Sequence, residues 1–205
     1  MLTIRRWIRI TPDGVRIDGR PVAVNDAEQP LPAALYRQYV GDYPKFFKMD
    51  PMCRLGFIAS ELLLRDEPER FTPREDCAVV LFSRSGSFAS DSHYQQTIAD
   101  AADYYPSPAV FVYTLANIAT GEIAIRNKFY GETICYLTDR KCAAQITATV
   151  REAFLDPGTR TVLCGWVESP SAQEYEATLA LVGETPDYGL EWNEQNVAEI
   201  MDIQR

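Results

Sequence analysis

Apolar residues recur along the chain with two different periods, which predict strands and helices in alternation. From Leu2 to Ile10 apolar and basic residues alternate as in a half-buried strand, and Thr11-Pro12-Asp13-Gly14 follows with turn-forming residues. After Asp50 and Pro51, by contrast, apolar residues recur at helical spacing, and an aspartate followed by a proline is a common way for a helix to begin. A helix over about 51–65 is therefore predicted.

Short, continuously apolar runs are typical of strands that are buried on both faces. Three such runs are present, Cys77–Phe82, Thr159–Val167 and Tyr175–Val182, and Glu132–Leu137 is a fourth strand-like segment. A short strand pair is expected at about 15–24, and further helices are expected at about 33–39, 93–102, 108–123, 139–154 and 192–203. Asp139 is the expected N-cap of the helix over 139–154.

The alternation of strands and helices through the middle of the chain indicates the fold class. It predicts a layered α/β fold in which a mixed, mostly parallel sheet is covered by helices and ends in an antiparallel strand pair. A length of 205 residues suits one domain, so a single domain spanning 1–205 is expected.

The charge of the chain bears on its partners and location. The formal net charge is -9, which would repel a phosphate backbone, so no nucleic-acid partner is expected. The one basic concentration, Arg5, Arg6 and Arg9, is interpreted as solvent-facing charge on a sheet edge. Because no apolar run approaches the ~20 residues of a membrane span, no span is expected and a cytoplasmic location is predicted.

Residues able to carry acid–base, thiol or metal chemistry are scarce. The five cysteines, an odd number without CxxC spacing, favour reduced thiols over a metal site or a disulfide framework. His93 is the single histidine and is interpreted as structural. The HExxH, GxSxG and GxGxxG motifs and the phosphate loop are absent, and Ser83–Ser87 is interpreted as a tight turn. No metal and no cofactor are expected.

The most informative stretch runs from Asn117 to Glu168. The segment Asn117–Arg126 (NIATGEIAIR), followed by Gly131, closely resembles the signature of the amino-terminal domain of β-ketoacyl synthases, in the thiolase-like superfamily. In that family the nucleophilic cysteine lies nine residues after the glycine, and that position here is Arg140. The family also carries a Gly-Gly-x-Glu strand end twenty-five residues after the nucleophile, which matches Gly165-Trp166-Val167-Glu168 without a gap.

This resemblance implies a retained nucleophile elbow, meaning a strand, a tight turn and a buried helix, with arginine in place of the thiol. The family's catalytic histidines and lysine come from a carboxyl-terminal half that this chain lacks. The expected function is therefore that of a non-catalytic, chain-length-factor-like synthase subunit in fatty-acid-like or polyketide biosynthesis. Trp166 in place of the second glycine is expected to crowd the strand end.

The resemblance also implies partners, because synthases of this family are two-fold dimers whose amino-terminal halves meet along a strand. A homodimer, or a heterodimer with a ketosynthase-like chain, is expected, and an acyl carrier protein is a further candidate partner. The surface that the other half of a synthase covers would be a large apolar patch. A second copy, a separate carboxyl-terminal half or the terminal helix of this chain could cover it.

Cys142 is the alternative nucleophile, because it lies only two residues beyond Arg140. Two positions along a helix rotate a side chain by about 200°, which would direct the thiol toward the opposite face. An acyl-transferring condensing enzyme that uses Cys142, or that a partner chain completes, is the alternative function. A third possibility is a diverged domain that keeps the fold for an unrelated interaction.

Overall fold

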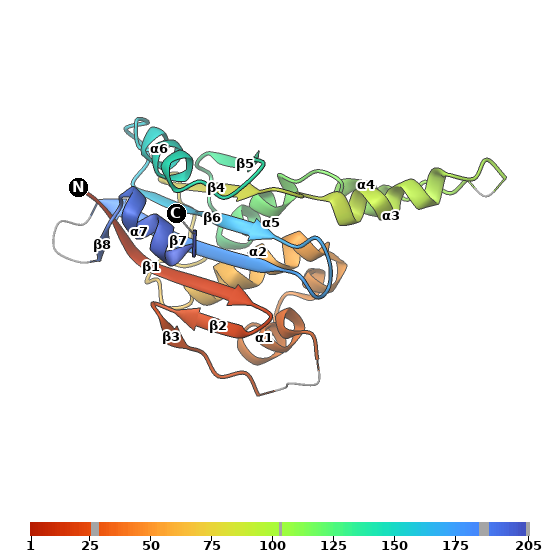
Figure 1. The fold of residues 1–205 in the computed structure, drawn as a ribbon, viewed down its shortest axis with the longest axis horizontal. Helices are drawn as coiled ribbons and strands as arrows, with labels where there is room; N and C mark the ends of the chain where they lie inside the picture. Colours follow the sequence, from red (N-terminus) through yellow and green to blue (C-terminus); the bar gives the residue numbers. More distant parts are fainter. Residues whose placement is uncertain (26–28, 103, 185–188, 204–205) are drawn as a thin grey trace.

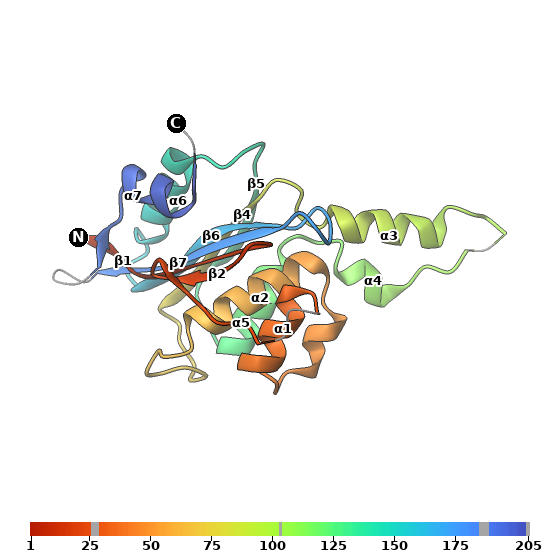
Figure 2. The same cartoon turned by 60° about the horizontal axis from the view of Figure 1, so that its bottom comes forward.

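One sheet lies between two layers of helices in the computed structural model, which describes residues 1–25, 29–102, 104–184 and 189–203 (Figures 1 and 2). The strands are β1 (Leu2–Thr11), β2 (Gly14–Ile17), β3 (Arg20–Pro21), β4 (Cys77–Ser83), β5 (Thr133–Leu137), β6 (Thr161–Glu168), β7 (Glu176–Glu184) and β8 (Leu190–Glu191). The helices are α1 (Leu31–Tyr39), the 3-10 helix η1 (Pro44–Lys48), α2 (Pro51–Leu63), α3 (Phe88–Ile98), α4 (Pro108–Val112), α5 (Ile118–Asn127), α6 (Ala143–Ala153) and α7 (Glu194–Ile200). Within these described ranges, no helix has the length and apolarity that crossing a bilayer requires.

The strand order is β3-β2-β1-β7-β6-β4-β5, and β8 pairs with β1 as well. Only β4 makes parallel pairs, with β5 and β6, and every other pairing among these strands is antiparallel. The layered α/β fold with a mixed sheet is confirmed, and so is the antiparallel pair β6–β7. The expectation of a mostly parallel sheet is wrong, because apolar periodicity reports burial and not strand direction.

Each face of the sheet is covered by its own group of helices (Figure 2). One hydrophobic cluster joins the sheet to α1, η1, α2 and α5, and the other joins it to α6 and α7. Helix α2 is buried on almost all sides, and the Asp50 side chain accepts a hydrogen bond from the Cys53 backbone N–H at 2.7 Å. The predicted N-cap and first-turn proline of this helix are confirmed.

Helices α6 and α7 cover one face of the sheet. Helix α6 buries Ile146 and Val150 against the sheet, whereas Gln145, Arg151 and Glu152 are exposed. The terminal segment lays Trp192 and α7 beside α6. The chain's own terminal helix therefore lies over this face beside α6, and the outward side of α6 carries polar residues.

Trp166 belongs to the same closed layer. Its side chain is buried in the cluster beneath α6 and α7, together with Trp192, whose Nε1 donates to the Thr147 carbonyl at 3.2 Å. Trp166 thus fills space between the sheet and helices α6 and α7. From the sequence, it was expected to crowd the end of its strand.

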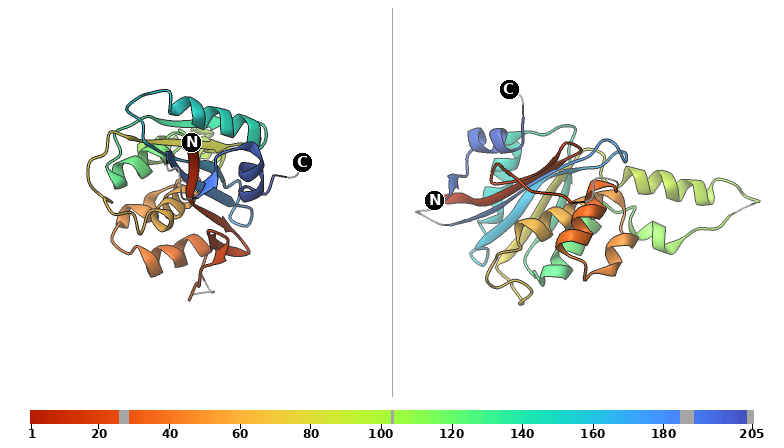
Figure 3. Two further views of the ribbon diagram at one scale, coloured as in Figure 1. Left: turned by 90° about the vertical axis from the view of Figure 1, so that its left-hand side faces the viewer. Right: turned by 90° about the horizontal axis from the view of Figure 1, so that it is seen from below.

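Two predicted helices in the middle of the chain differ from the structure. The segment predicted as one helix over 108–123 is divided into α4 and α5 by a turn, and the helix predicted over 93–102 is α3, which begins at Phe88. Helices α3 and α4 project beyond the end of the sheet (Figures 1 and 3). Residues 88–102 and 104–115 are called the arm below. Most described residues of the arm do not pack against the core, so the pattern of apolar residues did not predict where its helices begin and end.

Candidate functional site

The carboxyl ends of the parallel strands β4, β5 and β6 meet at one edge of the sheet. Three turns lie there, residues 83–87 after β4, residues 138–142 after β5, and residues 168–169 after β6. We call these residues the carboxyl edge. The expected nucleophile elbow is its middle turn, and carboxyl ends of strands are where ligands bind in open α/β sheets.

Glu168 holds the first and third turns of the carboxyl edge together. Its Oε2 accepts hydrogen bonds from the Ser83 hydroxyl at 3.0 Å and from the Arg84 backbone N–H at 2.7 Å. Its Oε1 accepts from the Ser85 N–H at 3.1 Å. Burial alone would raise the pKa of Glu168, but these hydrogen bonds together lower it. The sequence motif placed Glu168 at the strand end, but it did not indicate this anchoring role.

Replacing Glu168 with glutamine is expected to destabilise the chain by about 2 kcal/mol at pH 7, because hydrogen bonds to a charged acceptor are lost. Since folding lowers this pKa, the stabilisation is present above the unfolded value of about 4.3 and disappears as the pH falls through the folded value. Urea unfolding at pH 7 and below pH ~4 would measure the difference. Glu152→Gln, at an exposed position of α6, is the matched control. An equal loss for both variants would contradict the anchoring role.

Hydrogen bonds from Thr138 and Lys141 hold the turn after β5 in place. The Thr138 N–H donates to the Ser83 carbonyl at 2.9 Å, and the Thr138 hydroxyl donates to the Arg140 carbonyl at 3.1 Å. Lys141 Nζ reaches Glu176 at 2.7 Å and the Met201 carbonyl, at the end of α7, at 3.1 Å. The turn is thereby tied to the terminal segment, a contact that no local pattern indicates.

The glycine that opens β5 supports the register of the motif. A Cβ atom on Gly131 would lie 2.5 Å from the Cys77 carbonyl oxygen, which is closer than real Cβ atoms come. Only glycine fits here, at the start of the strand that leads to the elbow.

Arg140 is exposed in the turn, three residues before α6 begins at Ala143. Asp139 is therefore not the N-cap, and the predicted start of this helix is wrong. Here the Lys141 side chain contacts Glu176 of β7 and the carbonyl of Met201 at the end of α7, and the helix begins only after these contacts. Among the described residues, no hydrogen bond or ion pair involves the Arg140 guanidinium.

Cys142 occupies the N-cap position of α6, with an extended backbone and a half-buried side chain. The rotation of 200° expected between Arg140 and Cys142 does not apply, because neither residue lies inside the helix. Cys142 is thus the thiol at the helix N-terminus, although its side chain makes no capping hydrogen bond.

The other titratable candidates do not assemble a catalytic group. Burial raises the pKa of Cys53, Cys77 and Cys164, and it raises the pKa of Cys135 to about 11, so these thiols stay protonated at neutral pH. All five cysteines are free, as expected. His93 is exposed on α3. In the described part of the chain, no group of three or more His, Cys, Asp or Glu residues is arranged to hold a metal ion.

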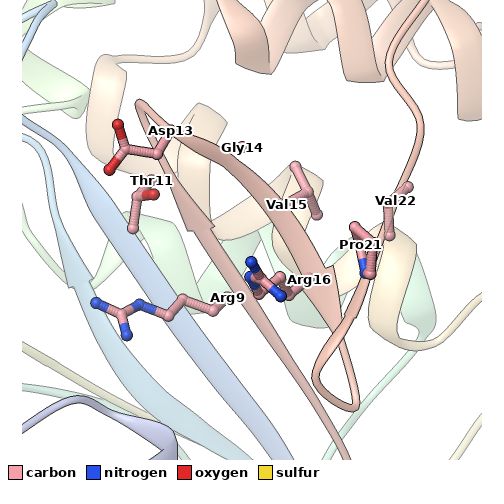
Figure 4. A pocket seen from close by; sticks show the side chains of 8 residues that line it. All are labelled: Arg9, Thr11, Asp13, Gly14, Val15, Arg16, Pro21 and Val22. Carbon is pink, nitrogen blue, oxygen red and sulfur yellow. The ribbon is translucent and has the colours of Figure 1, made fainter.

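The basic residues of β1 do not lie on an edge strand, because β1 is between β2 and β7. Arg5, Arg6 and Arg9 each pair with an acidic side chain. Figure 4 shows Arg9 and the cross-strand Arg16 in a hollow of about 410 Å³ beside β3. Arg9 is paired with Asp202 at 2.7 Å, so this hollow is not a free cationic patch.

Comparison with solved structures relates this arrangement to known proteins. The ishigamide ketosynthase/chain length factor matches with a TM-score of 0.69 and 20% identity, over 91% of this chain and 63% of that one. A ketosynthase (ApeO) in complex with its chain length factor (ApeC) from Xenorhabdus doucetiae matches with a TM-score of 0.59 and 15% identity, over 98% of this chain and 90% of that one. A type II PKS acyl-carrier protein in complex with its ketosynthase bound to the hexaketide (AntDE:AntF) matches with a TM-score of 0.58 and 14% identity, over 89% and 62%.

Neither a family model nor a curated protein sequence matches the chain. The chain spans just under two thirds of the first of these structures, at 63%, and most of the second, at 90%. The chain therefore has the fold of these ketosynthase and chain-length-factor structures.

Proposed function

We propose that this chain is a non-catalytic, chain-length-factor-like partner of a ketosynthase in polyketide or fatty-acid-like biosynthesis, acting as a single ketosynthase N-terminal-like domain. The observation that carries the proposal is the elbow itself. Its strand, turn and helix are retained, but an exposed arginine occupies the position where the family has its nucleophile. A guanidinium cannot attack a thioester, since it stays protonated in proteins.

The surface around β5 supports a partner role. Strand β5 is the last of the described strands in the sheet, so within the described part of the chain one side of its backbone has no neighbouring strand. The Val79 N–H donates to the Glu132 carbonyl and the Thr138 N–H donates to the Ser83 carbonyl, so even-numbered residues of this segment face β4. The N–H groups of Thr133, Cys135 and Leu137 consequently point outward, where a strand of a partner could accept them.

Exposed apolar side chains continue from this edge onto the arm. Leu137 ends β5 with 60% of its surface exposed, and it lies against the turn at Gly86, which leads into the arm. The exposed large apolar residues of the arm are Phe88, Tyr104, Tyr105, Phe111, Val112 and Leu115. Exposed large apolar side chains such as these are common at protein interfaces. The proposed partner is a ketosynthase-like chain, and co-expression with each complete ketosynthase of the same genome would test it.

Incubation with acyl-coenzyme A or acyl carrier protein thioesters is expected to leave the intact mass of the protein unchanged. The physical reason is that the elbow has no thiol at position 140 and the described residues place no histidine beside Cys142. Intact mass spectrometry of the wild type and of Cys142→Ala measures this directly. Acylation of the wild type that disappears in Cys142→Ala would contradict the non-catalytic proposal.

The alternative function, acyl transfer by Cys142, is favoured by one observation. Cys142 is the N-cap of α6, and helix N-termini are where reactive thiols are commonly placed. In this alternative, acylation would require the partner chain to supply the acid–base groups. Repeating the mass measurement on the co-purified pair separates the two functions, because only the alternative predicts an acyl group on this chain.

A further inference from the structure

A pocket of about 350 Å³ lies on the α1 and α2 side of the sheet, away from the β5 edge. It is bounded by α1, η1, the first turn of α2, the start of α3 and the loop after β6. Its lining is mostly proline, alanine, phenylalanine and leucine, including Phe46, Phe47 and Leu55. Pockets that hold small molecules have this size and this apolar character, with a few polar groups that set the orientation of the ligand.

Among the described residues, Arg54 is the one charged residue that lines this pocket. One of its terminal nitrogens, Nη2, donates to the Phe47 carbonyl at 2.7 Å, which holds the guanidinium in place. Its Nε is buried without a hydrogen-bond partner among the described residues, so the terminal nitrogens are the donors that a ligand in the pocket could reach.

The nearest acidic candidate does not satisfy Arg54. Asp50 lies one helical turn before Arg54, but its Oδ1 accepts from the Cys53 N–H and its Oδ2 accepts from the Ser90 hydroxyl. None of the described residues that line the pocket is acidic. Burial raises the pKa of Asp50 and the positive charge of Arg54 partly offsets this rise, but the two side chains form no salt bridge. An arginine that lacks a salt bridge among the described residues, in an otherwise apolar pocket, is complementary to an anion with an apolar body.

We propose that this pocket binds a small carboxylic acid with an apolar tail, of the size of a medium-chain fatty acid. The carboxylate pairs with the terminal nitrogens of the Arg54 guanidinium, and the tail lies on the apolar wall formed by residues such as Phe46 and Leu55. The pocket shares Ser169 with the carboxyl edge and Ala89 with the arm, but it includes neither β5 nor the turn at 138–142, so the proposal does not depend on the proposed function.

Octanoate and 1-octanol form a matched pair of probes, because they share the apolar tail and differ in the charged end. Isothermal titration calorimetry is expected to show that the wild type binds octanoate at least ten-fold more tightly than 1-octanol. Arg54→Met keeps the unbranched apolar stem, and it is expected to weaken octanoate binding at least ten-fold while leaving 1-octanol binding unchanged. Arg16→Met, at an exposed arginine outside this pocket, is the control and should behave as the wild type.

A blocking variant tests the location. Ala33→Trp, on a half-buried position of α1 that lines the pocket, is expected to abolish binding of both probes. Ala172→Trp, in the loop after β6, provides the same test from the opposite wall if the α1 variant does not fold. The proposal is overturned if the wild type binds neither probe, if both bind equally well, or if Arg54→Met binds octanoate as the wild type does. Pairing through β5, measured on the same variants, is expected to be unchanged.

Discussion

Cys135→Pro is expected to abolish association with the proposed ketosynthase-like partner while leaving the chain folded. The N–H of residue 135 points away from β4, so proline removes a donor at the free edge without removing a hydrogen bond of the sheet. Its ring also interrupts the row of outward donors next to Thr133 and Leu137. Size-exclusion chromatography with light scattering of the co-expressed pair measures the association, and circular dichroism measures the fold.

Two variants serve as controls for this experiment. Cys135→Ala removes the thiol but keeps the N–H, so it should preserve the complex. Ile134→Pro removes an N–H that faces β4, so it should destabilise the isolated chain by about 1–3 kcal/mol as the carbonyl opposite loses its partner. A complex that survives Cys135→Pro with unchanged affinity would show that β5 is not the interface.

Gly165→Ala is expected to destabilise the chain by about 4 kcal/mol or more, which places it among the most severe single substitutions. Gly165 has φ +155°, and a Cβ atom there would lie 1.9 Å from the Thr178 carbonyl oxygen and 2.9 Å from Leu179 Cα of β7. Both atoms belong to the backbone of the central strand pair β6–β7, so no side-chain movement can relieve the clash. Urea unfolding would report the change in free energy.

Gly121→Ala is the matched substitution at another glycine of the motif region. A Cβ atom on Gly121 meets no atom within 4 Å, and alanine is a better helix former by about 1 kcal/mol. We therefore expect Gly121→Ala to be neutral or slightly stabilising. If the two alanine variants unfolded at the same urea concentration, the close contact with the β7 backbone would not be the reason that position 165 needs glycine.

Elements with a core-facing apolar pattern were predictable from local sequence. The helix after Asp50 and the buried strands β4, β6 and β7 lie close to where apolar runs and turn residues predicted them. The beginning of α6 was predicted four residues too early, because the tie from Lys141 to Glu176 and Met201 joins residues far apart in the sequence. Strand direction was also misjudged, since alternation and burial are the same in parallel and antiparallel pairs.

The site was predictable only in outline. The spacing from Gly131 through Arg140 to Glu168 located the elbow, and the contacts of Gly131 and Gly165 give that spacing a steric reason. Local sequence did not indicate that Glu168 joins two turns, or that Cys142 is the N-cap of α6. These properties depend on where separate segments meet.

By itself, the sequence determined the order of most strands and helices, and its resemblance to the ketosynthase signature led us to propose that Arg140 occupies the nucleophile position. Burial periodicity and steric demands are local properties, so they can be read along one chain. Only the tertiary structure decided that α7 covers the face above Trp166, that β5 is the edge strand among the described strands, and that Arg54 lines a largely apolar pocket. Each of these depends on the packing of segments that are distant in sequence, and no local pattern encodes which of them come together.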